Sequence, residues 1–189
     1  EKAQKTFGRS FEVKSSPTVL AVGAHLKNTV ALSVEKNIFV SQHIGDLETK
    51  ESYDAFRRVV DDLQRLYEAR PEVVLCDLHP DYLSTQYARD LNLRCIPIQH
   101  HYAHVAACMA ENQLEGELLG VSWDGTGYGE DGTVWGGEFL LTTETSFERV
   151  GSFRQFPLPG GDRAIKEPRR SALGMLFEIN GHSMPEYED

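Results

Sequence analysis

The sequence predicts an α/β protein whose mixed β-sheet carries helices on its faces. Three short β-prone segments are followed by alternating helical and strand patterns, which gives the order βββαβαβα, and a second group of three strand patterns follows. Strands that alternate with helices pair in parallel, because a parallel connection needs a crossover of about a dozen residues or more. This order of elements is typical of a ribonuclease H-like lobe, followed by the opening strands of a second lobe.

The composition is that of an ordinary globular protein, with 189 residues, 40% hydrophobic and 25% charged. A net charge of −10 is the wrong sign for binding a phosphate backbone, so we expect no nucleic-acid partner. No apolar run approaches the roughly 18 residues of a membrane span, and the polar N-terminus lacks a signal-peptide core. We therefore expect no membrane partner and a cytoplasmic location. The three widely spaced cysteines lie in apolar runs, as reduced core thiols do.

The first elements form a predicted meander. Residues 1–16 are polar without periodicity and are interpreted as a linker or the tail of an upstream domain. Turn-type segments then separate three β-prone runs, at Val19–Val22, Val30–Val34 and Ile38–Gln42.

The central part alternates between helices and buried strands. Between Glu51 and Ala69 apolar residues recur at helical spacing, and Pro71 prevents the helix from continuing. The patterns that follow are the strand EVVLCDL, a helix over Tyr82–Leu91, the strand LRCIPI and a helix over His101–Asn112.

After Gly116 the pattern returns to strands, in LLGVSWD, TVWGGEFLL and SFERVGSF. We interpret residues 17–114 as a first ribonuclease H-like lobe and residues 115–189 as the incomplete start of a second. Too few residues remain to finish a second lobe of the same size, so we expect the chain to be a fragment. The last stretch, INGHSMPEYED, shows no closing element.

The segment QHHYAH is the most informative one. On a helix His100 and His104 are four residues apart and project from one face, a spacing at which two imidazoles can chelate zinc or another transition metal. The alternative is a pair of structural histidines at a helix start. The segment follows a buried strand directly, and ligands of α/β sheets gather beyond the carboxyl ends of strands.

The segment DGTGYGEDG follows the strand LLGVSWD. Three glycines within five residues allow a tight turn whose N–H groups could bind phosphate, and Asp124 is the natural carboxylate ligand beside it. The alternative is an ordinary β-hairpin, for which this is good turn chemistry. The segment matches neither a dinucleotide-binding fingerprint nor a P-loop.

Two further segments contain cations. Lys166, Arg169 and Arg170 form a local positive cluster that could bind phosphate or a carboxylate, although a solvated helix start with Pro168 in its first turn is the commoner arrangement. Lys27 in GAHLKN is a phosphate-binding candidate in what is more often a plain hairpin turn.

In this order the segments resemble the carbamoyltransferases of nickel–iron hydrogenase maturation, the HypF family. The resemblance runs from about Val19 to Leu176 and rests on AVGAHLKN, SQHIGDLE, CDLHPDYLSTQYA, IQHHYAHVAACMAEN, DGTGYGEDGTVWGGE and PLPGGDRAIKEPRRSALGML. HHYAH and DGTGYG are shared more widely with O-carbamoyltransferases and, more distantly, with threonylcarbamoyl transferases. SQHIGDLE, CDLHPDYLSTQYA and the stretch from PLPGGD to EPRR look specific to the hydrogenase branch.

The resemblance implies a two-lobed fold of the acetate kinase, actin and Hsp70 type. It implies that an upstream domain makes carbamoyl-adenylate from carbamoyl phosphate and ATP, and that the domain resembled here passes the carbamoyl group to the C-terminal cysteine of the maturation protein HypE. The other domains of a full-length protein would be further partners. Because the second lobe is incomplete, we expect no turnover by this chain alone.

The resemblance also implies roles for particular residues. It assigns the metal ligands to His100, His104 and Asp124, a phosphate cradle to Gly125, Thr126 and Gly127, and a binding arginine to Arg170. The metal would be zinc or iron. His101 would orient the carbamoyl group or take the thiol proton, with a supporting role as the alternative.

Three other functions remain open. One is O-carbamoyl transfer to a small hydroxylated molecule, and another is a non-catalytic nucleotide-binding lobe with structural histidines. A kinase of the same superfold is less attractive, because its phosphate loops begin with an acidic residue where this chain has GAHLKN.

Overall fold

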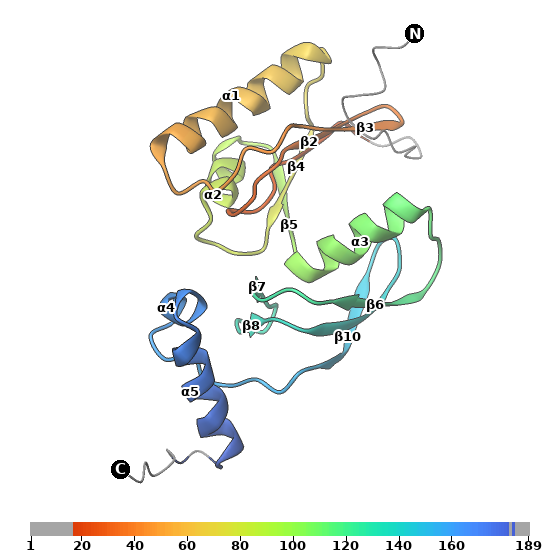
Figure 1. Cartoon of the computed structure of the whole chain (residues 1–189). Coiled ribbons are helices and arrows are strands. Elements are labelled where there is room, and N and C mark those ends of the chain that lie inside the picture. Colours follow the sequence, from red (N-terminus) through yellow and green to blue (C-terminus); the bar gives the residue numbers. More distant parts are fainter. Residues whose placement is uncertain (1–16, 182, 184–189) are drawn as a thin grey trace. The chain divides into compact units, whose positions relative to one another are not determined.

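The computed structural model describes residues 17–181 and residue 183, so the predicted linker at 1–16 and most of the last stretch lie outside the described residues. The chain divides into two compact units at residues 152 and 153. In the described residues, the first unit contains a five-stranded, a three-stranded and a two-stranded β-sheet with three helices, and the second contains two helices (Figure 1).

The first sheet is mixed and has five strands in the order β3-β2-β1-β4-β5. β1 pairs antiparallel with β2 and parallel with β4, and β4 pairs parallel with β5. The predicted α/β class and ribonuclease H-like order are confirmed. The strands are β1 Val19–Ala21, β2 Ala31–Val34, β3 Asn37–Val40, β4 Val73–Asp77 and β5 Arg94–Ile98.

Two helices complete the core of this sheet. α1 spans Lys50–Leu66 and begins at a capping box, in which Thr49 and Ser52 exchange side-chain to backbone hydrogen bonds. Phe56 of α1 is fully buried, and α2, Leu83–Asp90, adds Ala88. They pack against Leu20, Leu32 and Val74 of the sheet, and each large apolar side chain stabilises the fold by roughly 1.5–3 kcal/mol.

Two of the three cysteines are neighbours in this part of the fold. Cys76 is buried in the core, and its Sγ lies 3.5 Å from that of Cys95. Burial, with a contribution from Cys95, raises the pKa of the Cys76 thiol to about 12. Cys108 is exposed, so the expectation of a core thiol is wrong for this residue, which faces solvent on its helix.

These environments predict a large difference in alkylation. At pH 8 we expect iodoacetamide to modify Cys108 at least about a hundred-fold faster than Cys76, because the thiolate is the nucleophile and Cys76 is protonated and covered. Peptide mapping by mass spectrometry measures both rates. All cysteines should react in urea, and equal rates in the native chain would contradict the buried position of Cys76.

The second sheet has three antiparallel strands in the order β10-β9-β6: β6 Leu118–Ser122, β9 Glu138–Thr142 and β10 Phe147–Ser152. The prediction that TVWGGEFLL forms a single strand is wrong. The segment divides at Gly136 into β8, Val134–Trp135, which pairs with β7, Gly127–Tyr128, and β9, which pairs with β6. A change of partner strand explains the division.

The helix α3, His100–Asn112, follows β5 in the chain but packs on the second sheet. Its residues Val105 and Met109 form a small core with Trp135 and Leu140. A Cβ on Gly120 would lie within 2.4 Å of Val105, so the helix and β6 approach closely. The predicted boundary between the lobes at residue 114 stays a prediction.

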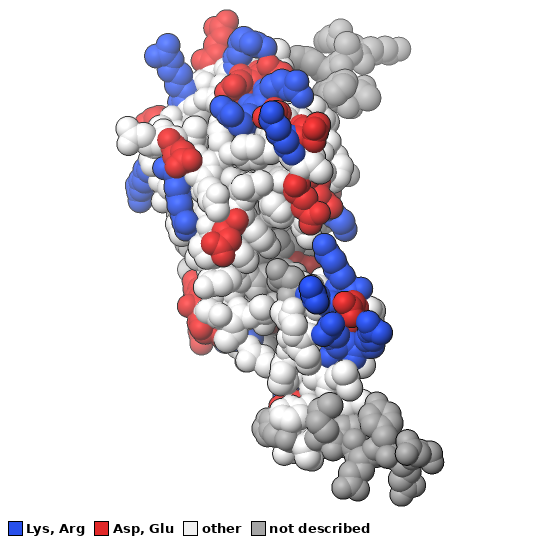
Figure 2. All heavy atoms as spheres, turned by 90° about the vertical axis from the view of Figure 1, so that its left-hand side faces the viewer, with Lys and Arg blue, Asp and Glu red and all other residues white. Residues whose placement is uncertain are grey.

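The second unit contains α4, Asp162–Lys166, and α5, Pro168–Ile179. Pro168 occupies the first turn of α5, which is the helix start considered for this segment. Figure 2 shows Lys and Arg side chains gathered around an acidic one at the height of these helices. Within the described part of the chain, no helix combines the length and the apolar character that crossing a bilayer requires.

Candidate metal centre

The end of β4 lies beside the start of α3. Gln99 caps this helix, because its side chain accepts a hydrogen bond from the backbone N–H of Tyr102 at 2.8 Å. The helix therefore begins at His100, one residue earlier than predicted. Asp77 is the last residue of β4, and its Oδ2 lies 2.7 Å from Nδ1 of His100. This contact connects the first sheet to the helix of the second.

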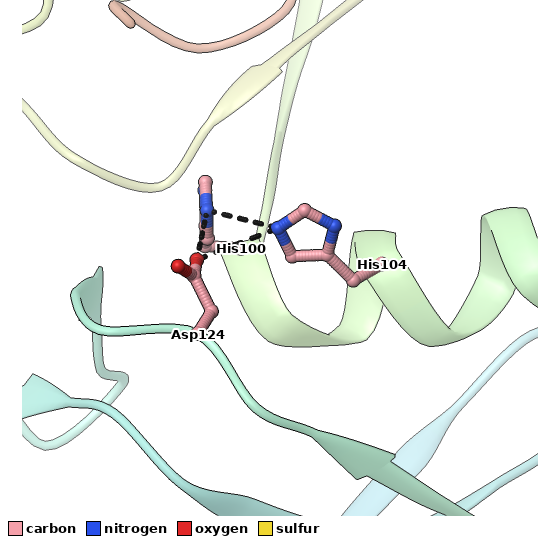
Figure 3. A group of neighbouring side chains, drawn as sticks. All are labelled: His100, His104 and Asp124. Atoms are coloured by element: carbon pink, nitrogen blue, oxygen red, sulfur yellow. Dashed lines mark hydrogen bonds and ion pairs between the residues drawn. The ribbon is translucent and has the colours of Figure 1, made fainter.

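The structure brings together three side chains from the two most informative segments of the sequence. The Nε2 atoms of His100 and His104 lie 3.2 Å apart. Oδ2 of Asp124, just beyond β6, lies 2.8 Å from Nε2 of His100 and 3.4 Å from that of His104. Figure 3 shows the two imidazoles, on successive turns of α3, pointing toward this carboxylate.

The spacing of these atoms fits a bound metal ion. Ligands about 2.0–2.1 Å from a tetrahedral zinc ion are separated by about 3.3 Å, close to the distances seen here. The Oδ1 atom of Asp124 accepts the N–H of Gly125 at 2.8 Å, which leaves Oδ2 for the metal. The His104 side chain is 58% exposed, so further ligands can approach from that side. Three protein ligands and an accessible position are typical of catalytic zinc sites.

Asp77 also contacts this group of side chains, and the sequence patterns did not predict it as a candidate site residue. Its side chain is 5% exposed, and its hydrogen bond favours the tautomer of His100 in which Nδ1 carries the proton and Nε2 is free for a metal. The hydrogen bond to Asp77 outweighs burial and raises the pKa of His100. An available signal was the acidic end of EVVLCDL, because parallel strands end at the same sheet edge.

His101, predicted to be catalytic, is fully buried. Its Nδ1 lies 3.1 Å from the side-chain nitrogen of Gln99, and its Nε2 is buried without a hydrogen-bond partner among the described residues. Burial lowers its pKa. A Cβ on Gly127 would lie 2.5 Å from the His101 ring, so this glycine accommodates the imidazole. The described conformation therefore gives His101 a packing contact with β7.

The segment DGTGYGEDG supplies β7 and the turn of the β7–β8 hairpin, which is the alternative for this segment, and of the predicted phosphate cradle only Gly127 lies in β7. Gly125 is exposed and a Cβ there would meet nothing within 4 Å, whereas Gly127 is buried. Neither glycine has a positive φ, so the αR-αL form of an anion nest is not present. Gly125 and the half-buried Thr126 remain beside Asp124, and their phosphate-binding role stays a prediction.

The two predicted cationic residues are not part of the three-residue group. Lys27 is exposed, and its backbone N–H donates to Asp46 at 2.8 Å. Arg170 belongs to the second unit, where its Nε donates to Glu167 at 2.9 Å. Glu167 also accepts from Arg169, and the two arginines lower the pKa of this carboxyl. Part of the local positive charge is therefore compensated.

We call His100, His104 and Asp124 the metal-ligand group. A groove of about 500 Å³ leads away from this group between α3 and β6. His104 and Asp124 line one part of it, and Cys108 lines the α3 side. Most of its other lining is apolar, including Val121 and Trp123 of the β6 segment. The metal-ligand group is thus accessible to a ligand from the groove.

The mixed five-stranded sheet, with the group His100, His104 and Asp124 beyond the ends of its parallel strands, defines an α/β domain of ribonuclease H-like order. Residues 14–111 match the model of the HypF Kae1-like domain, and residues 120–189 match that of the second subdomain of the carbamoyltransferase Kae1-like domain. The chain therefore belongs to the HypF family of carbamoyltransferases.

Curated relatives and solved structures agree with this assignment. The chain is 46% identical over 164 residues to carbamoyltransferase HypF of Synechocystis sp. (86% of this chain, 21% of the relative) and 32% identical over 174 residues to a probable carbamoyltransferase HypF of Methanocaldococcus jannaschii (89% and 23%). A crystal structure of full-length HypF in a phosphate- and nucleotide-bound form is 43% identical, with a TM-score of 0.85 over 93% of this chain and 23% of that one. The chain spans about a fifth of the length of these relatives.

Proposed function

We propose that this chain forms part of a domain that transfers a carbamoyl group during hydrogenase maturation. The donor would be carbamoyl-adenylate, made from carbamoyl phosphate and ATP in another domain, and the acceptor the C-terminal cysteine thiol of HypE. The observation that carries the proposal is the convergence of His100, His104 and Asp124 in a chain of the carbamoyltransferase family. The relative crystallised with phosphate and nucleotide supports an adenylate as the donor.

The reaction requires a thiolate to attack the carbamoyl carbon. A carbon–sulfur bond forms, the bond from the carbamoyl carbon to the adenylate phosphate oxygen breaks, and AMP leaves with the electron pair. The thiol proton is released to a base or to water. The protein must therefore hold the carbamoyl oxygen and the phosphate still while negative charge develops on them.

The described residues suit this task. A divalent zinc or iron ion held by the metal-ligand group would supply Lewis-acid stabilisation of that charge. Asp77 holds His100 in the orientation that presents Nε2, and the Gly125 N–H holds Asp124. His101 supports the hairpin through its contact with Gly127, and we assign it this supporting role. The groove beside His104 offers the acceptor a largely apolar surface.

The proposal is tested by following the transfer of carbon-14-labelled carbamoyl groups from carbamoyl-adenylate. The protein used is zinc-loaded and has the full length of the HypF relatives, with residues 17–181 of this chain in place of the matching segment. A peptide ending in cysteine and a small sugar compete as acceptors. We expect label on the peptide thiol, and at least about a hundred-fold less with His100→Ala. Label on the sugar would favour O-carbamoyl transfer. No label on either acceptor, with bound nucleotide, would favour a non-catalytic lobe.

A further inference from the structure

The segment WGGE contains a buried carboxylate that the proposed reaction does not use. The Glu138 side chain is 2% exposed. Its Oε1 accepts the backbone N–H groups of Gly136 and Gly137 at 3.0 and 3.4 Å, and its Oε2 accepts from Nε of Arg149 at 2.6 Å. Burying a charged group is costly unless it is paired and hydrogen-bonded. The two backbone hydrogen bonds and the ion pair with Arg149 together compensate the buried charge of Glu138.

Arg149 connects Glu138 to the hairpin beside the metal-ligand group. Its guanidinium lies 4.1 Å from the centre of the Trp135 ring and 3.3 Å from Asp131, which lies between β7 and β8. Asp131 also accepts the indole N–H of Trp135 at 2.9 Å. Three charged side chains and one aromatic ring thus hold β8 against the start of β9.

Gly136 lies where the chain leaves β8 and enters β9, opposite Asp124. The β6–β9 ladder ends with the pair Ser122 and Glu138, and the β7–β8 ladder begins with Gly127 and Trp135. Between these ladders a Cβ on Gly136 would lie 3.1 Å from the backbone oxygen of Gly125 and 3.4 Å from that of Asp124. The Gly136 backbone therefore packs directly on the peptide that carries the Asp124 carboxylate.

We infer that Glu138 is a positioning residue: it holds the Gly136 turn against the Asp124 backbone and so sets where the carboxylate of Asp124 lies relative to the two histidines. The inference rests on the proposed metal site and adds Glu138 of β9 as a residue that positions one of its ligands. A positional change of a few tenths of an ångström at Gly125 is transmitted to Asp124, because the two residues share a peptide and a side-chain hydrogen bond. Metal affinity depends on ligand placement at this scale.

Two variants test the inference in different ways. Gly136→Ala keeps every charge and pushes the Gly125 carbonyl, whereas Glu138→Gln removes the charge that pairs with Arg149. Gly151→Ala is the matched control on the same sheet, because a Cβ there meets Phe139 at an ordinary 3.6 Å. The affinity for Zn²⁺ is measured by competition with a chelator, the coordination by the absorption spectrum of bound Co²⁺, and the stability of the metal-free chain by thermal unfolding.

We expect Gly136→Ala and Glu138→Gln to weaken Zn²⁺ binding by about 10- to 100-fold and to change the Co²⁺ spectrum, while Gly151→Ala leaves both unchanged. A merely structural role would lower the melting temperature but leave the affinity and spectrum of the folded protein unaltered, and that result would overturn the inference. If Glu138→Gln does not fold, Gly136→Ala decides alone. Failure of the unmodified chain to bind Zn²⁺ would instead refute the metal site itself, and the inference with it.

Discussion

Replacing both His100 and His104 by alanine should remove the metal from this protein. In the unmodified chain two imidazoles and one carboxylate place their ligand atoms within 4.8 Å of one another, and only Asp124 would remain in the variant. A single carboxylate does not hold a transition metal against water. We expect near-stoichiometric zinc or iron(II) in the unmodified chain and a loss of affinity well above about a hundred-fold in the variant. Removing only a hydrogen-bond partner behind a metal ligand already costs about 10- to 100-fold, and removing two ligands costs more.

Elemental analysis after dialysis, with a chelator competition for the affinity, measures this effect. The matched control is His43→Ala, which removes an exposed imidazole outside the group. The metal content of that variant should equal that of the unmodified chain. Metal retained by the double variant would show that the ion binds elsewhere. The absence of metal from all three proteins would favour structural histidines in the HHYAH segment.

Replacing Asp77 by asparagine should weaken metal binding through its effect on His100. The carboxylate accepts the Nδ1–H of His100, and its loss leaves the imidazole free to adopt either tautomer and a different orientation. We expect Zn²⁺ affinity to fall by about 10- to 100-fold, the usual effect of removing a carboxylate behind a histidine ligand. Asp81→Asn is the control, because Asp81 is an exposed carboxylate in the segment between β4 and α2.

The same substitution should change the titration of the metal-free chain. The hydrogen bond to Asp77 raises the pKa of His100 above its ordinary value of about 6.5, so the Asp77→Asn variant should show a lower pKa. In the unmodified chain, protonated His100 contributes stability that is complete below the unfolded-state pKa and is lost as pH rises through the folded-state pKa. Metal binding has the opposite dependence, because it requires neutral His100.

Nuclear magnetic resonance titration of the His100 ring measures the pKa, and urea unfolding at several pH values measures the stability. An unchanged pKa and an unchanged Zn²⁺ affinity in Asp77→Asn would contradict the role of Asp77. A lower His100 pKa with an unchanged Zn²⁺ affinity would show that the hydrogen bond exists but does not affect metal binding.

Local patterns were enough to predict most of the first sheet. Period-two and buried apolar runs gave β1 to β5 in their observed order, and the spacing of apolar residues gave α1 within a few residues of its ends. The i and i+4 spacing of His100 and His104 also placed both imidazoles on one face of α3. These features depend on residues close in the sequence.

The sequence by itself determined the α/β class, the order of the first elements and the pairing of the two histidines on one helix, because each follows from local spacing. Tertiary structure alone decided that Asp77 supports His100, that His101 is buried against Gly127, and that TVWGGEFLL divides at Gly136. Asp77 meets His100 because β4 and β5 are neighbours in the first sheet, His101 meets Gly127 where α3 approaches β7, and TVWGGEFLL divides because β8 and β9 pair with different strands. Side-chain contacts of this kind leave no periodic signal, since packing across sheets selects them one residue at a time.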